Sequence, residues 1–317
     1  MSRMARFWLW LLLPACLGAQ VELSHKADRV DVRVNGRPFG ALYFGKDANK
    51  PFFYPLRTAS GKKVTRSFPM EHVAGEPTDH PHQKGLWVGA ERLSGMDFWE
   101  NDSSYKRPRM GKIVFRDVTR MASGREGVLG FKADWISLEG STIISETQSM
   151  TFYSEPKDAR IVDVDLNLNA REAVTFEDHQ DAVIGIRLAP AFDEAHGGEA
   201  VNAEGLRGEA GARGRASRFL DWRTNLDGEE VGVAILDHPE NLNAPARWHL
   251  RAFGFMTANP FARKVFDEKA ESAAKTMKPG ESLHLRYRVI VHSADFDLEA
   301  AFQDFAGAAR PQESGTE

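Results

Sequence analysis

Two histidines separated by one proline stand at residues 79–87, which read DHPHQKGLW. A proline favours an extended conformation for the residue before it, and extended backbone repeats its side-chain direction every two residues. We therefore expect His80 and His82 to point the same way, about 7 Å apart, on one wall of a site. A structural role for one histidine and a solvated position for the other is the alternative.

A second group of polar and aromatic residues lies at 236–261, where the Asp-His-Pro tripeptide returns at residues 237–239. If a strand begins near residue 246, Trp248 faces the core, while His249 and Arg251 face the other side. These two side chains then line a polar cleft or lie on a solvated charged surface. We expect the two His-Pro loops to meet over one hollow of a sheet.

Imidazole groups titrate near neutral pH, so a histidine paired with a carboxylate can act as a general acid or base. Carboxylates are available, and the sequence does not rank them: Asp79, Glu91, Asp97, Glu100, Asp178, Asp181 and Asp237. A divalent metal is the alternative, held by His80, His82 and either His238 or His249. No His-Glu-x-x-His or Cys-x-x-Cys motif supports that metal, and the sequence identifies no other cofactor.

Other sequence features limit the class of protein. The chain lacks the G-x-S-x-G, P-loop and dinucleotide motifs, which argues against a serine hydrolase, an NTPase and an NAD enzyme. A hydrophobic content of 42%, a charged content of 27% and a net charge of -4 give no basic excess, so no nucleic acid partner is expected. Trp87, Trp99 and Trp222 could form an apolar platform for a sugar ring or belong to the core.

Residues 1–19 have the order of a secretory signal, with two arginines before the apolar residues 7–13 and small residues after them. The apolar run is too short to span a bilayer, so we expect no integral membrane association. Cys16, the only cysteine, could be the lipidated residue of a lipobox; cleavage after Ala19 is the alternative. Either way we expect an exported protein, which is periplasmic, an outer-membrane lipoprotein or secreted.

Alternating apolar and polar residues predict many half-buried strands. Residues 30–34 alternate valines with polar residues and lead into Asn35-Gly36, a strong hairpin signal. Further strands are predicted at 111–121, 127–140, 141–153, 160–170, 182–188, 231–236, 248–255 and 283–292. One helix is predicted within 295–309, with Asp295 or Asp297 as its cap.

These elements predict an all-β fold, a large antiparallel β-sandwich with a short C-terminal helix. We expect residues 20–309 to form one domain and residues 310–317 to be a disordered tail. Residues 197–216, rich in Gly, Ala and charge, have no apolar period, so we expect a long mobile loop beside the site.

Three stretches, at residues 50–70, 79–89 and 236–261, resemble the bacterial PmoA-like family, a domain family of unknown function often labelled methane oxygenase. The resemblance covers nearly all of residues 28–292. It implies a galactose-mutarotase-like supersandwich and an exported protein of carbohydrate-degrading bacteria. We reject methane chemistry, because the membrane subunit behind that label spans the bilayer many times and this chain has one short apolar segment.

The resemblance also implies candidate site residues. By position in the motifs they are His80, His82, Lys84, Trp87, Arg187, His238, Asn243, Trp248, His249, Arg251 and Asn259. In the segment DHQDAVIGIR, Asp181 stands where relatives carry a glutamate and His179 where they carry a threonine, and an aspartate reaches less far by one methylene.

We therefore expect an exported carbohydrate-active enzyme that acts on a glycoside or keto-sugar by hydrolysis or elimination. The expected catalytic residues are His80, His82, His238, His249 and Asp181. The expected substrate contacts are Lys84, Trp87, Arg187, Asn243, Arg251 and Asn259. A mutarotase-like sugar epimerase and a non-catalytic glycan-binding envelope protein are the alternatives.

Overall fold

The computed structural model describes residues 20–46, 48–105 and 107–308. The predicted signal segment 1–19, with Cys16, and the predicted tail 310–317 lie outside the described residues. No helix in the described ranges has the length and hydropathy needed to cross a bilayer.

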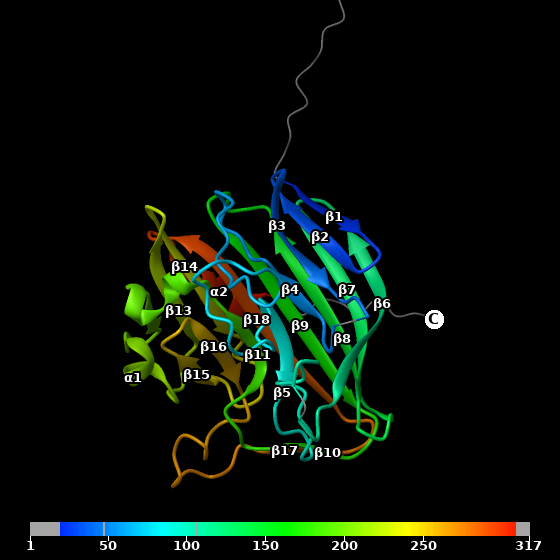
Figure 1. The fold of residues 1–317 in the computed structure, drawn as a ribbon. Helices are drawn as coiled ribbons and strands as arrows, with labels where there is room; N and C mark the ends of the chain where they lie inside the picture. Colours follow the sequence, from blue (N-terminus) through cyan, green and yellow to red (C-terminus); the bar gives the residue numbers. More distant parts are fainter. Residues whose placement is uncertain (1–19, 47, 106, 309–317) are drawn as a thin grey trace, which may run out of the picture.

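In the described part of the chain, two eight-stranded antiparallel sheets and one two-stranded sheet make up the fold (Figure 1). The first sheet has the order β1 (Val21–His25), β2 (Arg29–Val34), β3 (Arg37–Tyr43), β4 (Phe52–Tyr54), β5 (Leu86–Ala90), β11 (Ala182–Arg187), β16 (Phe255–Asn259) and β15 (Arg247–Arg251). The second sheet has the order β12 (Glu199–Asn202), β13 (Phe219–Leu226), β14 (Glu229–Asp237), β18 (Ser282–Ser293), β9 (Arg160–Ala170), β8 (Thr142–Tyr153), β7 (Glu126–Ile136) and β6 (Lys112–Ala122).

The remaining elements are short. The two-stranded sheet pairs β10 (Val174–Phe176) with β17 (Lys275–Met277). The helices are η1 (Pro190–Phe192), η2 (Glu194–His196), α1 (Gly208–Ala212) and α2 (Leu298–Gly307). The predicted all-β antiparallel sandwich with a short C-terminal helix is confirmed.

The core lies between the two sheets, whose facing sides contribute to one apolar cluster. On β9, the buried side chains Val162, Val164, Leu166 and Leu168 alternate with less buried polar residues, which is the period that a half-buried strand requires. Hydrophobic burial of this kind, at about 25 cal/mol per Å², is the main favourable contribution to folding.

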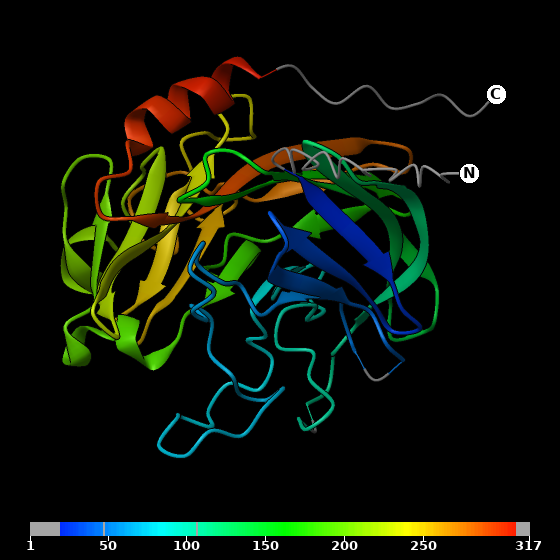
Figure 2. The same ribbon diagram turned by 90° about the horizontal axis from the view of Figure 1, so that it is seen from above.

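Helix α2 covers the outer face of the second sheet, as Figure 2 shows. The side chain of Asp297 accepts a hydrogen bond from the backbone N–H of Ala300 at 2.9 Å, so the predicted cap is confirmed. Leu298, Phe302 and Phe305 bury the apolar side of the helix against the sheet.

Two predicted elements are wrong. Residues 248–255 do not form one strand, because the chain reverses between β15 and β16 at Gly254, whose φ of 73° is a conformation that glycine adopts most readily. Residues 197–216 are not an unstructured loop, because they contain β12 and α1. The hairpin at Asn35-Gly36 is confirmed, with φ of 53° and 73°.

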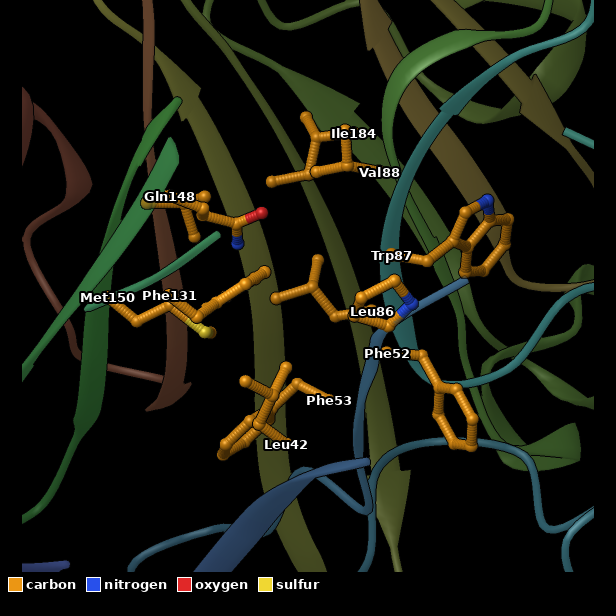
Figure 3. A pocket seen from close by; sticks show the side chains of 12 residues that line it. Leu42, Phe52, Phe53, Leu86, Trp87, Val88, Phe131, Gln148, Met150 and Ile184 are labelled. Carbon is orange, nitrogen blue, oxygen red and sulfur yellow. The ribbon is translucent and has the colours of Figure 1, made fainter. Parts of the chain in front are cut away.

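Strand β5 shows the two faces of the first sheet (Figure 3). Leu86 and Val88 point between the sheets, where they line a cavity of about 20 Å³ together with Met150 of the second sheet. A cavity of this size holds about one water molecule. Trp87 is turned to the opposite side of the strand and belongs to a separate aromatic cluster on the outer face of the first sheet.

Gly185 tests the packing on that outer face. A Cβ at Gly185 would lie 2.6 Å from a ring carbon of Trp99 and 3.0 Å from a ring carbon of Trp87, so the two tryptophans occupy the space of the missing side chain. We predict that Gly185→Ala lowers the free energy of unfolding in urea by about 1–3 kcal/mol. Gly307→Ala, where no atom lies within 4 Å, is the control. An unchanged midpoint for Gly185→Ala would contradict this packing.

Candidate functional site

Rows of side chains cross the outer face of the first sheet. One row follows the strand pairing from His249 of β15 to Thr257 of β16, Gly185 of β11 and Trp87 of β5. The row on one side begins with Arg247 and Asn259, and the row on the other contains Arg251, Phe255 and Arg187. Strand spacing places the Cα atoms of His249 and Arg187 about 12 Å apart.

Aromatic rings cover the centre of this face. The rings of Trp87 and Trp99 lie 5.1 Å apart, and Phe255 lies 6.2 Å from Trp87. Both tryptophans are buried, so neither offers an open stacking surface, and Trp222 belongs to the core between the sheets. The rings therefore form a rigid apolar layer between two polar clusters.

The first polar cluster, called the acid–base cluster below, consists of Glu91, His179, Asp181 and His249. His249 Nδ1 lies 3.0 Å from Asp181 Oδ1, and both residues are buried. Burial alone would raise the pKa of Asp181, but the hydrogen bond from His249 and the nearby imidazole charge lower it overall. Asp181 therefore stays ionised and fixes the orientation of His249.

The pKa of Glu91 is shifted in the opposite direction to the pKa of Asp181. Burial, together with the negative charges of Asp181 and Asp97, raises the pKa of Glu91 to about 8. At neutral pH the Glu91 carboxyl is therefore protonated and donates a hydrogen bond to Asp181. His179 Nδ1 lies 3.3 Å from Glu91 Oε2, and burial lowers the pKa of His179, so that imidazole is neutral at pH 7.

Hydrogen bonds link Glu91 to Asp181 and Asp181 to His249, and His179 lies against Glu91, so the cluster has an imidazole at each end. When Nδ1 of His249 donates to Asp181, Nε2 carries the lone pair. Nε2 of His249 is buried and has no hydrogen-bond partner among the described residues. A buried nitrogen without a hydrogen-bond partner costs about 1–3 kcal/mol in folding free energy.

The second polar cluster, called the arginine cluster below, holds the first His-Pro loop in place. Arg66 donates to the backbone oxygens of Asp79 and His80, both at 2.8 Å, and to the Asp79 carboxylate at 2.6 Å. Arg187 donates to Gln83 Oε1 at 2.7 Å and stacks on Phe253, with its guanidinium carbon 4.0 Å from the ring centroid. Burial and the charge of Arg66 lower the pKa of Arg187 to about 9.

The histidines of this loop lie side by side, although His80 is not extended. Its φ is 45°, and the rings of His80 and His82 have centroids 5.7 Å apart. His80 is 40% exposed and its Nδ1 lies 2.5 Å from Asp79 Oδ2. His82 is buried against Tyr105, and burial with the charge of Lys50 lowers its pKa to about 2. His82 is therefore neutral at physiological pH and accepts a proton poorly.

Several predicted substrate contacts are already paired within the protein. Lys84 lies 2.7 Å from Asp102, and Arg251 lies 3.0 Å from Glu209. Asn259 donates to the backbone oxygen of His179 at 2.7 Å and so fixes one end of the acid–base cluster. With Asn243 and other residues, Asn259 also lines a cavity of about 220 Å³.

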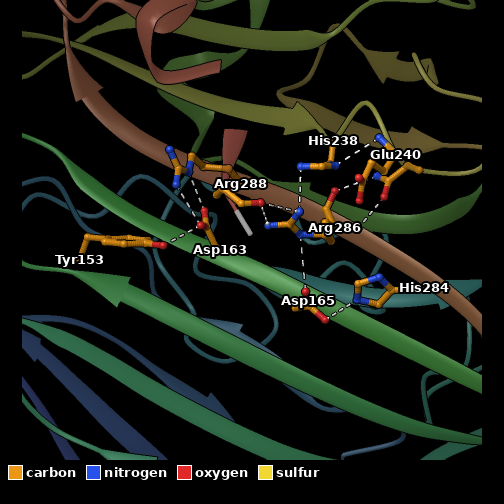
Figure 4. Close-up of polar contacts among 10 residues, drawn as sticks. Tyr153, Asp163, Asp165, His238, Glu240, His284, Arg286 and Arg288 are labelled. Atoms are coloured by element: carbon orange, nitrogen blue, oxygen red, sulfur yellow. Dashed lines mark hydrogen bonds and ion pairs between the residues drawn. The ribbon is translucent and has the colours of Figure 1, made fainter. Parts of the chain in front are cut away.

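His238 lies elsewhere, so the expectation that the two His-Pro loops meet is wrong. It follows β14 of the second sheet, where its Nε2 accepts a hydrogen bond from Arg286 at 2.8 Å (Figure 4). Its ring packs on Phe305 of α2. The turn after it is fixed by the buried Asp237, which accepts from Asn241 and from the backbone of Ala246. His238 thus belongs to the opposite outer face, under α2.

Glu91, His179 and Asp181 are also the residues that could hold a divalent cation. One potential ligand atom from each lies within 4.8 Å of the others, and no other group of three such residues occurs in the described ranges. The pair His80 and His82 therefore has no third ligand there. Within this group, Glu91 is hydrogen-bonded to Asp181 and lies 3.3 Å from His179.

In the sequence, Glu91 is one of seven carboxylates that local pattern does not rank, and Arg66 and Gln83 stand in no motif that marks them as site residues. His179 and Asp181 stand two residues apart before an apolar strand, a spacing that could have indicated a shared direction. Their pairing with Glu91 depends on contacts between β5 and β11, which lie nearly a hundred residues apart in the sequence.

The raised pKa of Glu91 makes stability depend on pH. Because the folded pKa exceeds the unfolded value, the folded state binds more protons between about pH 4.5 and 8, and stability falls as pH rises through that window. We predict that Glu91→Gln, measured by thermal denaturation against wild type, gains on the order of 1 kcal/mol from pH 5 to pH 9. The exposed Glu172→Gln is the control. A difference that does not change with pH would show that Glu91 ionises normally.

Comparisons with known proteins address the chain as a whole. Three similar solved structures are each named as "putative": a kojibiose phosphorylase from the human microbiome and aldose 1-epimerases from Klebsiella pneumoniae subsp. pneumoniae and from Escherichia coli K12. The Klebsiella protein has a TM-score of 0.42 and 8% identity, over 94% of this chain and 91% of that chain. The Escherichia protein has a TM-score of 0.35 and 10% identity, over 87% and 100%.

The kojibiose phosphorylase has a TM-score of 0.38 and 7% identity, over 86% of this chain, which spans 32% of the length of that protein. No curated protein matches the chain. A family model matches residues 29–306, and it is a family of unknown function, not one described as PmoA-like. The chain therefore belongs to the family of unknown function DUF6807.

Proposed function

We propose that this protein is an exported carbohydrate-active enzyme that moves protons through the acid–base cluster. The observation that carries the proposal is the cluster of His179, Glu91, Asp181 and His249, in which the protonated carboxyl of Glu91 adjoins an aspartate that holds Nδ1 of His249, while Nε2 has no partner among the described residues. Groups whose pKa values are pushed apart by their surroundings are typical of paired acids and bases in active sites.

The geometry favours elimination over hydrolysis. Glycoside hydrolysis uses two carboxyl groups on opposite sides of the bond, about 5 Å or about 6.5–9.5 Å apart. Glu91 and Asp181 instead share a hydrogen bond, so they cannot flank a glycosidic bond. Because one of two adjacent carboxyl groups keeps its proton while the other is ionised, the pair can donate a proton to a substrate.

In a keto-sugar, elimination needs a base and an acid. Nε2 of His249 takes the proton from the carbon next to the carbonyl, and the C–H electron pair forms the enolate. When the enolate collapses, the C–O bond to the leaving group breaks, and the leaving oxygen takes the proton of Glu91. Asp181 stabilises the imidazolium that His249 becomes.

The sugar would lie across the aromatic layer towards the arginine cluster. His80, which is partly exposed, is a contact for a sugar hydroxyl at that end. The ring of the neutral His82 packs against the ring of His80. Export is supported by the order of charged, apolar and small residues at 1–19.

A sugar epimerase is the second candidate, because the acid–base cluster has an imidazole at each end. One imidazole could remove the proton of the anomeric hydroxyl while the other end delivers a proton to the ring oxygen. Exchange between anomers, followed by NMR, separates this activity from elimination, which produces an unsaturated ketone that absorbs in the ultraviolet.

The proposal predicts a large loss of activity when the hydrogen bonds of the acid–base cluster are disrupted. Asp181→Asn removes the negative charge that holds His249, so turnover of 3-keto-glycosides should fall by about 10²–10⁴-fold. His196→Ala, at an exposed histidine outside the cluster, is the control. If Asp181→Asn folds and keeps full turnover, the acid–base cluster is not catalytic. Glycan binding by the wild-type protein without turnover would favour the non-catalytic alternative.

The pH dependence of kcat should follow from the protonation of Glu91. The acid must carry its proton, so kcat should fall as pH rises through about 8. In Glu91→Gln the residual kcat should lose this alkaline decline. A wild-type kcat that stays constant up to pH 10 would exclude Glu91 as the acid.

A further inference from the structure

Two cavities open beside the acid–base cluster, at the β15 edge of the first sheet. One has a volume of about 610 Å³ and lies between α1 and residues 265–267. The other, of about 220 Å³, lies between residues 243–247 and residues 259–263. Arg247 lines both, so the cavities share a wall.

Four arginines line these cavities: Arg213, Arg215, Arg247 and Arg263. The hydrogen bonds that these guanidinium groups donate go to uncharged oxygen acceptors. Arg213 donates to Gln180 Oε1 at 2.8 Å, Arg247 to a backbone oxygen at 2.6 Å, and Arg263 to an amide oxygen at 3.3 Å. None of the four forms an ion pair with a carboxylate within the described ranges.

Two carboxylates, those of Glu209 and Asp267, line the cavities and offset only part of the charge of the four arginines. Glu209 is held by Arg251 at 3.0 Å and accepts the backbone N–H of Ala252 at 2.7 Å. Asp267 is the other acidic residue in the lining. The cavities therefore carry an excess of positive charge in a chain whose net charge is -4.

Residues that line the cavities also contact residues in or next to the acid–base cluster. Arg213 contacts Gln180, the residue before Asp181, and lies over the ring of Phe266, which is 6.4 Å from the ring of His249. Asn259, in the lining of the smaller cavity, donates to the backbone of His179. A ligand bound in these cavities would therefore lie next to the acid–base cluster.

We propose that these cavities bind a negatively charged sugar residue, so that the substrate is an acidic oligosaccharide bearing carboxylate or sulfate groups. A planar guanidinium matches two oxygens of either group with parallel N–H bonds. The inference rests on the proposed function, because it places the charged residue next to the one at which proton transfer occurs.

Binding tests the proposal without turnover. Titration calorimetry with the full-length protein carrying Glu91→Gln would compare an oligogalacturonate, a sulfated oligosaccharide and a neutral oligosaccharide of equal length. We expect at least one anionic ligand to bind about tenfold or more tightly than the neutral one. Arg215→Gln and Arg263→Gln should each weaken that binding about tenfold and reduce its dependence on salt. Arg120→Gln, on the exposed face of β6, is the matched control.

The outcomes are distinct. Selective binding of the carboxylate or the sulfate ligand, lost on substitution at 215 or 263, supports the proposal and identifies the charged group. Equal affinity for charged and neutral ligands, or binding unchanged by both substitutions, overturns it. Neither result depends on turnover, so failure here is separate from failure of the Asp181→Asn assay.

Discussion

The hydrogen bond between Glu91 and Asp181 is the constraint on which the site depends. Two carboxyl groups this close cannot both be ionised at low cost, so one must keep its proton. His249 stabilises the charge on Asp181, and the proton therefore stays on Glu91. The protein thus holds a neutral acid and an anion side by side at neutral pH.

The fold makes this arrangement possible by keeping the four side chains on one face. Glu91 directly follows β5, Asp181 directly precedes β11, and His249 lies on β15. The antiparallel pairing of β5 with β11 brings Glu91 and Asp181 together, since the backbone N–H of Glu91 donates to the oxygen of Asp181 at 2.9 Å. The aromatic layer beside the cluster limits access of water and keeps these interactions strong.

Much of the fold could be predicted from local pattern, because a strand with one buried face repeats every two residues. The valines and leucines of β9 and the Asn35-Gly36 turn are examples. The turn at Gly254 was missed because residues 248–255 are apolar enough to read as one strand. The site was harder to predict. The structure places the predicted residues His249 and Asp181 in one cluster. His238, however, occurs in the same tripeptide as His80, and local similarity does not reveal that β14 belongs to the other sheet.

The central claim is that Glu91 is protonated at neutral pH. Infrared difference spectra between wild type and Glu91→Gln would measure it directly, because a protonated carboxyl and a carboxylate absorb at different frequencies. We expect a protonated-carboxyl band at pH 6–7 that disappears as pH rises through about 8. A carboxylate band for Glu91 already present at pH 6 would contradict the account.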